Sequence, residues 1–430
     1  MSELLKKNFY LIGVFSTLGA LMVNVGGTAI AFVNLLLFTS VVLQILNGNC
    51  RIYKYKWPLL LLALGFILSS INGLFILNKA WISESMKFTI KFLIFLFPFT
   101  VLYSDEEILE YRKYFFKGLF ISCCIQLLWE FLQIVVWSKF NISINEVIFG
   151  QLLNIKIKNS WTFISDGRFR PAGVSWEPAN LALSLVIGFV LSKNNYYKIL
   201  FVIGILLSTS RTGIIVLVFI IIINLLISKR KNSKKKVIKK KDILLGIIFC
   251  IILVMGIFYI SNNPKEIMEY ITKGIQTTYK KLVNLDVDSS ALTHTQYYKK
   301  MGYVFAKGNL LNDFIGYGTS SSGFAYAKFL SIYIDKTGWN PESDFITLLF
   351  GNGVLGVFTY YMSIILAIKY NIRDKNACLI IISIVFSGIF YLYIRGSWTI
   401  IILFMLFVKN GDIKNEVNLV NYKKQLEGEL

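Results

Sequence analysis

The stretch "ILFVIGILLSTSRTGIIVLVFIIIINLLI", residues 199–227, is almost wholly apolar, yet Arg211 lies near its middle. A charge at the centre of a membrane-spanning helix costs roughly 2.5–3.5 kcal/mol on insertion scales. That cost is avoided if the stretch forms two helices, because the polar segment "STSRTG" then forms a hairpin at a membrane surface. The sequence therefore predicts two spans, 196–210 and 211–228, with Arg211 at the start of the second.

The whole chain has the composition of a helical membrane protein. Of its 430 residues, 55% are hydrophobic and 16% are charged, whereas soluble proteins carry about 25% charged residues. Helices satisfy their own backbone hydrogen bonds in lipid, so repeated apolar runs predict an all-α, polytopic integral membrane helix bundle. We expect one membrane domain over residues 1–430. Its twelve expected transmembrane helices are 8–25, 28–46, 57–77, 86–103, 114–137, 178–192, 196–210, 211–228, 243–260, 344–368, 377–394 and 396–408.

The net charge is +21, and the positions of the basic residues indicate how the chain crosses the membrane. The loop "SKRKNSKKKVIKKKD", residues 228–242, holds nine lysines and arginines between two apolar spans. Basic loops stay on the cytoplasmic side, where anionic lipids attract them. We therefore expect anionic membrane lipids, and no nucleic acid, as partners of this loop.

The other basic loops agree with that orientation. If the N-terminus is cytoplasmic, every strongly basic short loop falls on the same side, as the positive-inside rule requires. The inside loops are then 51–56, the turn 104–113, 193–198, 228–242 and 369–375. The tail, 409–430, is then also cytoplasmic, and two long segments, 138–177 and 261–343, face outward. The N-terminal apolar stretch lacks a convincing cleavage site, so we expect an uncleaved first helix.

Metal and nucleophile motifs of soluble enzymes are missing. The cysteines lie in or beside apolar spans without metal-ligand spacing, and His294 is the single histidine. Asp286 and Asp288 form a short acidic pair of the kind that can hold a divalent ion. Such pairs arise easily by chance, so we expect no metal and no cofactor.

Arginines gather at the expected outer surface instead. Arg168 and Arg170 precede the sixth span, Arg211 begins the eighth, and Arg395 precedes the last. A single arginine at a helix end can simply extend to the interface, but several on one surface suit a diphosphate, which arginine binds with paired hydrogen bonds. Glu177, directly before Pro178, reads as a helix start and as a candidate binding residue.

The second outer segment holds two further polar patterns. "GYGTSSSG", residues 316–323, is a loop that could approach a phosphate or a sugar, although it lacks the lysine of a P-loop. Asn340-Pro341-Glu342 predicts a helix start with Asn340 as the cap and acids in the first turn. The aromatic residues of the outer segments are candidates either for stacking on sugars or for interfacial anchoring. They are Trp161, Trp176, Tyr317 and Trp339.

In the order of these motifs the sequence resembles the O-antigen and capsular polysaccharide polymerases (Wzy-type), relatives of the O-antigen ligases. The motifs are "RFRPAGVSWEPANLA" before a middle helix, "STSRTG" at an outer hairpin, a lysine-rich inner loop, a long outer loop, and "PESDFITLLFGNGVLGV" opening the next helix. The resemblance in topology covers nearly the whole chain. The local motifs are short, so the resemblance rests on their order and spacing.

The resemblance implies a GT-C-like glycosyltransferase of the bacterial inner membrane that uses neither metal nor nucleotide sugar. Its substrate would be an undecaprenyl-diphosphate-linked oligosaccharide, and a chain-length regulator and a flippase would be its candidate protein partners. By position, Arg170 and Arg211 match arginines associated with the lipid diphosphate. Many relatives begin the helix with His-Asn, and the position of that His is Glu342 here. Three alternatives are open: Glu342 is the general base, His294 acts from the loop, or base catalysis contributes little.

Three functions remain open at this point. The first is polymerisation of lipid-linked repeat units, with a variant at Glu342 expected to lose activity and one at Asp344 to keep most of it. The second is a ligase that transfers finished polymer to another acceptor. The third, from a different class, is a lipid-linked oligosaccharide flippase, which would favour charges deep within spans and repeat symmetry. The charges at one surface favour the enzymes, with Glu130 and Arg395 as the nearest exceptions.

Overall fold

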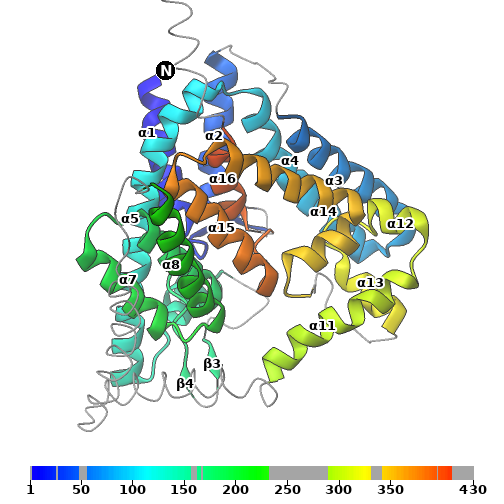
Figure 1. Cartoon of the computed structure of the whole chain (residues 1–430). Coiled ribbons are helices and arrows are strands. Elements are labelled where there is room, and N and C mark those ends of the chain that lie inside the picture. The colour runs from blue at the N-terminus through cyan, green and yellow to red at the C-terminus, as the bar shows by residue number, and fades with distance from the viewer. Residues whose placement is uncertain are drawn as a thin grey trace, which may run out of the picture.

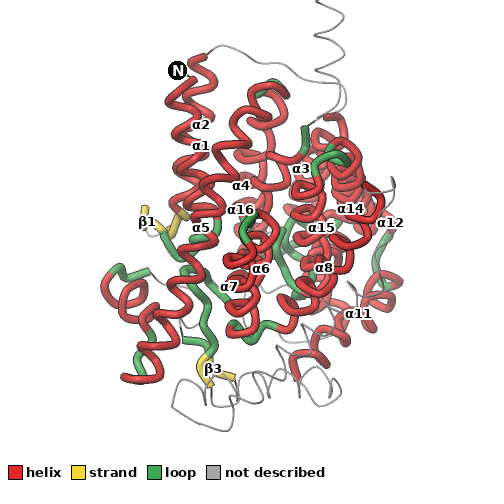
Figure 2. The backbone as a smooth tube through the Cα atoms, turned by 60° about the vertical axis from the view of Figure 1, so that its left-hand side comes forward, coloured by secondary structure: helices red, strands yellow, loops and turns green. Residues whose placement is uncertain are grey.

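The computed structural model describes residues 2–25, 28–47, 56–155, 162–165, 168–231, 289–330, 341–394 and 396–408. These residues form a bundle of helices with two short β-hairpins, as Figures 1 and 2 show. The predicted all-α membrane bundle is therefore confirmed. The hairpins pair β1 (Met22–Val25) with β2 (Thr28–Ala31), and β3 (Ile164–Ser165) with β4 (Arg168–Phe169), both antiparallel.

Most expected spans coincide with a helix. The helices of the bundle are α1 (Ser2–Ser16), α2 (Phe32–Asn47), α3 (Trp57–Ile76), α4 (Lys79–Val101), α5 (Asp105–Phe140), α6 (Pro178–Leu191), α7 (Asn195–Leu207), α8 (Arg211–Lys231), α14 (Asp344–Tyr370), α15 (Lys375–Phe390) and α16 (Ser397–Leu406). The expected outer segments contain a π-helical turn (Glu146–Leu152), α11 (Ser289–Ala306), α12 (Leu310–Ile315) and α13 (Ser322–Leu330). The expected span 243–260 and residues 232–242 of the basic loop 228–242 lie outside the described residues.

Three described helices are long and apolar enough to cross a membrane by length and composition: α3, α5 and α14. Six shorter apolar helices accompany them in the described part of the chain. At 1.5 Å per residue, the 36-residue α5 is about 54 Å long, well beyond a hydrocarbon core of about 30 Å. It therefore extends past the membrane and provides a rigid support for the loops at its far end.

The first two spans differ from the prediction. The helix expected over 8–25 is α1, which ends at Ser16, and the following residues form the β1–β2 hairpin before α2 begins at Phe32. Sequence hydropathy does not report the long-range polar contact made where α1 ends. The Thr17 hydroxyl, directly after α1, is buried and lies 2.6 Å from the Ser122 hydroxyl of α5.

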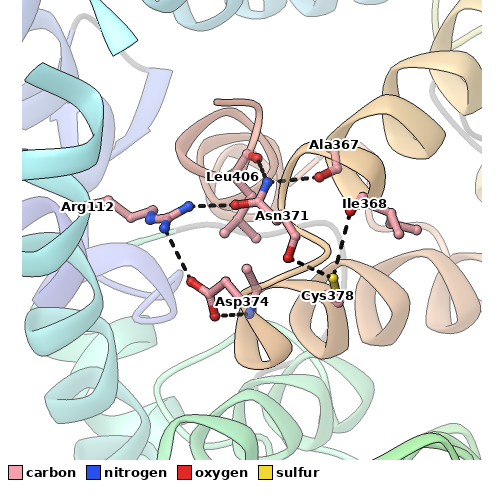
Figure 3. A network of polar contacts seen from close by, with 8 residues as sticks. Arg112, Ala367, Ile368, Asn371, Asp374, Cys378 and Leu406 are labelled. Carbon is pink, nitrogen blue, oxygen red and sulfur yellow. Dashed lines mark hydrogen bonds and ion pairs between the residues drawn. The ribbon is translucent and has the colours of Figure 1, made fainter. Parts of the chain in front are cut away.

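One end of the bundle is held together by ion pairs. Arg112 of α5 donates to Asn371 Oδ1 at 2.7 Å and to Asp374 Oδ2 at 3.2 Å, and Asp374 caps α15 (Figure 3). Lys56 lies 3.5 Å from Asp105, and Lys6 lies 2.9 Å from Glu110. Residues of several segments that the charge pattern places inside therefore meet at one end of the bundle.

The opposite end carries the segments that the charge pattern places outside. The β3–β4 hairpin and α11 lie there, far from the N-terminus in Figure 1. Between the two ends, a buried apolar core includes stacked rings such as Phe66 and Phe92, whose centroids are 4.0 Å apart. Large apolar side chains also cover the outside of the bundle, with Phe75 of α3 84% exposed. Such a surface suits contact with lipid.

Candidate functional site

Arg170 joins two segments that are distant in sequence. It follows β4, where Phe169 is buried and stacks on Trp137 of α5 with ring centroids 4.6 Å apart. The Arg170 guanidinium donates from Nε to Thr209 Oγ1 at 3.1 Å and from Nη2 to the Thr209 carbonyl at 3.4 Å. Thr209 lies in the hairpin between α7 and α8, two residues before Arg211. The structure thus connects the segments of both arginines that the sequence associated with a diphosphate.

The hairpin itself has the form that the sequence predicted. α7 ends at Leu207 and α8 begins with the half-buried Arg211, so the arginine is at a helix start and not in the middle of a span. Thr209 has a φ of 51°, which is uncommon for a β-branched residue and costs free energy. The two hydrogen bonds from Arg170 help to hold this conformation. For Arg168, the structure describes the backbone in β4 only.

Buried amides of α5 fix the segment that follows Arg170. The backbone N–H of Gly173 donates to Gln133 Oε1 at 2.8 Å, and that of Val174 donates to Gln126 Oε1 at 2.7 Å. Asn145 donates to the Gly173 carbonyl at 2.9 Å. Buried polar groups are costly unless they are paired. These side chains therefore hold the residues between Arg170 and Glu177 in one conformation.

Sequence analysis missed this support, although the signal was present. Ser122, Gln126, Glu130 and Gln133 recur at intervals of three and four residues within the apolar span 114–137. That spacing puts them on one helix face. A polar face inside an otherwise apolar span indicates buried hydrogen-bond partners, and here those partners are the backbone groups of Thr17, Gly173 and Val174.

Substitution of Gly173 tests this support. Its φ is +63°, and an added Cβ would lie 2.1 Å from Gln126 Oε1. We expect Gly173→Ala to lower the free energy of unfolding by about 1–3 kcal/mol, measured as a lower melting temperature in detergent. Gly302→Ala in α11 is the control, since no atom lies within 4 Å of its added Cβ, and it should melt like the wild type or slightly higher. Equal melting of both variants would contradict the role of Gln126.

Glu177 lies where the sequence placed it, at the start of α6. Pro178 occupies the first helical position, and Glu177 is the half-buried N-cap residue, whose side chain makes no capping hydrogen bond. The phenol of Tyr393 donates to the Ala179 carbonyl at 3.0 Å. The turn 391–396 therefore packs on the first turn of α6. Arg395, which belongs to that turn in sequence, lies outside the described residues.

The start of α14 corrects the prediction for the second acidic motif. The helix begins at Asp344, and its cap is Ser343, whose hydroxyl accepts from the Ile346 N–H at 3.5 Å. Asn340, the predicted cap, lies outside the described residues and three positions before the observed one. Glu342 therefore precedes the cap and is exposed, whereas Asp344 is only 2% exposed. The two acids do not share a first turn.

Of the two candidate general bases, His294 is part of α11 and Glu342 lies near it. Burial, and secondly the Glu342 carboxylate, raise the pKa of Tyr297 in α11 to about 12. Tyr298 is held by hydrogen bonds to the Ser343 hydroxyl and to the Ile389 carbonyl, each 2.6 Å long. Burial is the main reason that the pKa of Tyr298 is raised. His294 lies one turn before these tyrosines on α11, and its side chain is outside what the structure describes.

The glycine-serine loop 316–323 is a buried structural element and not a phosphate-binding loop. The Thr319 hydroxyl accepts from Asn352 at 2.9 Å and donates to the Phe66 carbonyl at 3.2 Å. The backbone N–H of Tyr317 donates to the Phe350 carbonyl at 2.8 Å. This contact lies next to Gly353, where α14 departs from helical geometry with a φ of 66°. Because α3 and α14 take up these polar groups, the loop does not present them to a ligand.

The four aromatic candidates differ in their exposure. Tyr317 is buried, with 1% of its side chain exposed, so it has no face open to a sugar. Trp176 is 45% exposed, and its indole N–H donates to the Gly19 carbonyl. It stays a candidate for stacking. Trp161 and Trp339 lie outside the described residues.

Within the described ranges, no group of three or more His, Cys, Asp or Glu residues could hold a metal ion. Asp286 and Asp288, the acidic pair noted in the sequence, fall outside those ranges. Arg170 and Arg211 are positively charged residues that the structure describes in this region.

Residues 196–361 match the family model described as O-antigen ligase (Wzy_C). The match runs from α7 into α14, so it includes Arg211, His294 and Glu342. A comparison with curated proteins finds no match. The family match supports placement in the O-antigen polymerase/ligase superfamily, whose members are membrane-embedded, glycosyltransferase-like enzymes of O-antigen-related polysaccharide biosynthesis.

Proposed function

We propose that this protein polymerises oligosaccharide repeat units carried on undecaprenyl diphosphate, at the outer face of the bacterial cytoplasmic membrane. The observation that carries the proposal is the pair of hydrogen bonds from Arg170 to Thr209, in the hairpin that bears Arg211. Two arginine-bearing segments are thereby fixed against each other at one end of a membrane bundle. A lipid-linked diphosphate has its charge at that depth.

The reaction is a glycosyl transfer. A sugar hydroxyl of one lipid-linked unit attacks the anomeric carbon of another chain, the bond from that carbon to the diphosphate oxygen breaks, and undecaprenyl diphosphate leaves. Negative charge accumulates on the leaving diphosphate. Prepositioned guanidinium groups of Arg170 and Arg211 stabilise that charge without a metal ion, through charge-assisted hydrogen bonds. Arg168 and Arg395, by their sequence positions, would add to the same positive surface.

The proton of the attacking hydroxyl needs an acceptor. Glu342 is exposed at the outer end, and it lies close enough to Tyr297 to raise the pKa of that phenol. Its carboxylate is therefore in reach of solvent and of an incoming sugar. We assign the general base to Glu342, with His294 of the neighbouring α11 as the alternative. Glu177 and the exposed ring of Trp176 would contact the sugars.

The orientation of the protein in the membrane follows from the distribution of its basic residues. The end of the bundle that holds the Arg112–Asp374 and Lys56–Asp105 pairs contains residues of segments that the charge pattern assigns to the inside, so we place it and both termini in the cytoplasm. The loop 228–242 would then contact anionic lipids of the inner leaflet. Protein partners of this assignment are a chain-length regulator and a flippase.

The family description favours a second candidate, an O-antigen ligase that transfers finished polymer to another acceptor. The same arginines and the same leaving group would serve that reaction. The difference lies in the acceptor, which is a second lipid-linked sugar chain in a polymerase and a different acceptor in a ligase. We prefer the polymerase because the order and spacing of the sequence motifs resemble those of the polymerases.

One observation favours transport over transfer. Glu130 is fully buried in α5, and neither of its carboxyl oxygens has a hydrogen-bond partner among the described residues. Ionisable groups at such depth often mark transport pathways. Glu130 is, however, one turn from Gln126 and Gln133, which hold backbone groups of the outer segment. We therefore keep the flippase as an outcome of the following experiment.

A deletion strain distinguishes the three functions. If the protein is the polymerase, cells that lack it should carry single repeat units in place of long chains, as measured by gel electrophoresis and mass spectrometry of the polysaccharide. Long polymer retained on undecaprenyl diphosphate would indicate the ligase instead. Repeat units confined to the cytoplasmic leaflet would indicate the flippase. Polymer of normal length on its normal acceptor would contradict all three.

A further inference from the structure

Asp344 is buried at the outer end, and its carboxylate binds a different segment of the chain. Its Oδ1 accepts the backbone N–H groups of both Tyr393 and Ile394 at 2.7 Å. Its other oxygen lies against Gly388, where an added Cβ would be 2.4 Å from Oδ2. One carboxylate therefore ties the start of α14 to the end of α15 and to the turn 391–396.

Helix capping does not explain this acid. Ser343 already caps α14 through its hydroxyl, and the Asp344 carboxylate is directed to N–H groups outside its own helix. Asp374 at the inner end shows the ordinary arrangement. It caps α15 by accepting from the Ala377 N–H at 3.1 Å. The comparison indicates that Asp344 fixes a tertiary contact.

This contact connects the two sides of the candidate site, the start of α14 and the start of α6. Along the chain, Asp344 is two residues from Glu342. Tyr393, which Asp344 holds by its N–H, donates from its phenol to the Ala179 carbonyl at 3.0 Å, two residues after Glu177. The acid therefore connects the α14 side of the site with the α6 side through a single turn.

We propose that Asp344 is a positioning residue, which keeps the first turn of α6 and the Glu342 segment at a fixed separation through Tyr393. The inference rests on the proposed glycosyl transfer. Asp344 does not touch the reacting atoms. It holds the two segments that would contact the donor and the acceptor, and a misplacement of about 1 Å can lower a rate about 100-fold. This conclusion reverses the expectation from the sequence that Asp344 is dispensable.

The test compares Asp344→Asn, Asp344→Ala and Tyr393→Phe with Asp374→Asn, all reconstituted with a lipid-linked repeat unit. We expect kcat per folded protein to fall about 100-fold in Asp344→Ala and about tenfold in Asp344→Asn and Tyr393→Phe, with KM nearly unchanged. Asp374→Asn should melt at a lower temperature and keep its kcat, because its bonds lie at the other end of the bundle. Hydrogen exchange of the peptide 391–396 should quicken only in the Asp344 variants.

The outcomes separate this inference from the proposed function. If the wild-type protein makes no polymer, the proposed function fails. If it does, and folded Asp344→Ala has the wild-type kcat, only the positioning role is overturned. Should Asp344→Ala fail to fold, Asp344→Asn and Tyr393→Phe decide the matter, because they keep the size of the side chains. Wild-type kcat in both would contradict the inference.

Discussion

Arg211→Lys is expected to lower polymer formation at least about 100-fold, the cost typical of removing one preorganised donor from a site of developing charge. Lysine keeps the positive charge but loses the planar fork that binds two phosphate oxygens together. Arg170→Lys should be similarly impaired. It also loses the geometry of the two bonds to Thr209, at 3.1 and 3.4 Å, that fix the hairpin. Polymer length and yield, at equal protein in the membrane, measure the effect.

Arg373→Lys is the matched control for these variants. Arg373 is exposed in the short segment between α14 and α15, at the end of the bundle that carries Asp374. The same exchange of side chains there should leave polymerisation unchanged. If Arg170→Lys and Arg211→Lys also polymerise at the wild-type level, both arginines are interfacial anchors and have no part in stabilising the diphosphate.

Glu342→Gln is expected to fold, to reach the membrane and to make about 10²–10⁴-fold less polymer, since an amide cannot accept the proton that a general base removes. We expect Glu342→Gln to fold normally, because Glu342 is exposed and the Ser343 cap of α14 does not involve its side chain. Initial rates of chain extension, measured on purified protein, report the loss.

Glu106→Gln provides the control for the exchange of an acid by its amide. Glu106 is exposed in the first turn of α5 at the inner end, where its carboxylate contributes about 0.3–1 kcal/mol through the helix dipole. It should retain full activity. Wild-type rates in Glu342→Gln would remove Glu342 from the mechanism. In that case His294→Ala becomes the decisive variant, and its loss of activity would assign the base to α11.

The helix starts with strong local signals were predictable from the sequence. Arg211 divides a run that is too long and too apolar for one span, and α8 begins at that residue. Pro178 fixes the start of α6 because its ring suits the first helical position. The expected span 344–368 begins where α14 begins, but its cap was misplaced, since Asn340 and Ser343 are both good caps by type. Only the extended backbone of Ser343 and its bond to the Ile346 N–H select between them.

Long-range hydrogen bonds account for most of what the sequence did not reveal. Gln126 and Gln133 could be recognised as a polar face, but their partners at Gly173 and Val174 lie 40 or more residues away in the chain. Asp344 appeared to be one of two equivalent acids until its contact with Tyr393 was located. The loop 316–323 has the composition of a ligand-binding loop, and its burial against α3 and α14 is what excludes that role.

Reconstitution tests the central claim most directly. Purified protein is placed in proteoliposomes with one synthetic undecaprenyl-diphosphate-linked repeat unit as the only sugar substrate, and the products are sized by mass spectrometry. We predict a ladder of chains spaced by one repeat unit, with release of undecaprenyl diphosphate, and no ladder with Arg211→Lys. A wild-type protein that leaves the single unit unextended, or that transfers it only to an added acceptor of another kind, would contradict the assignment as a polymerase.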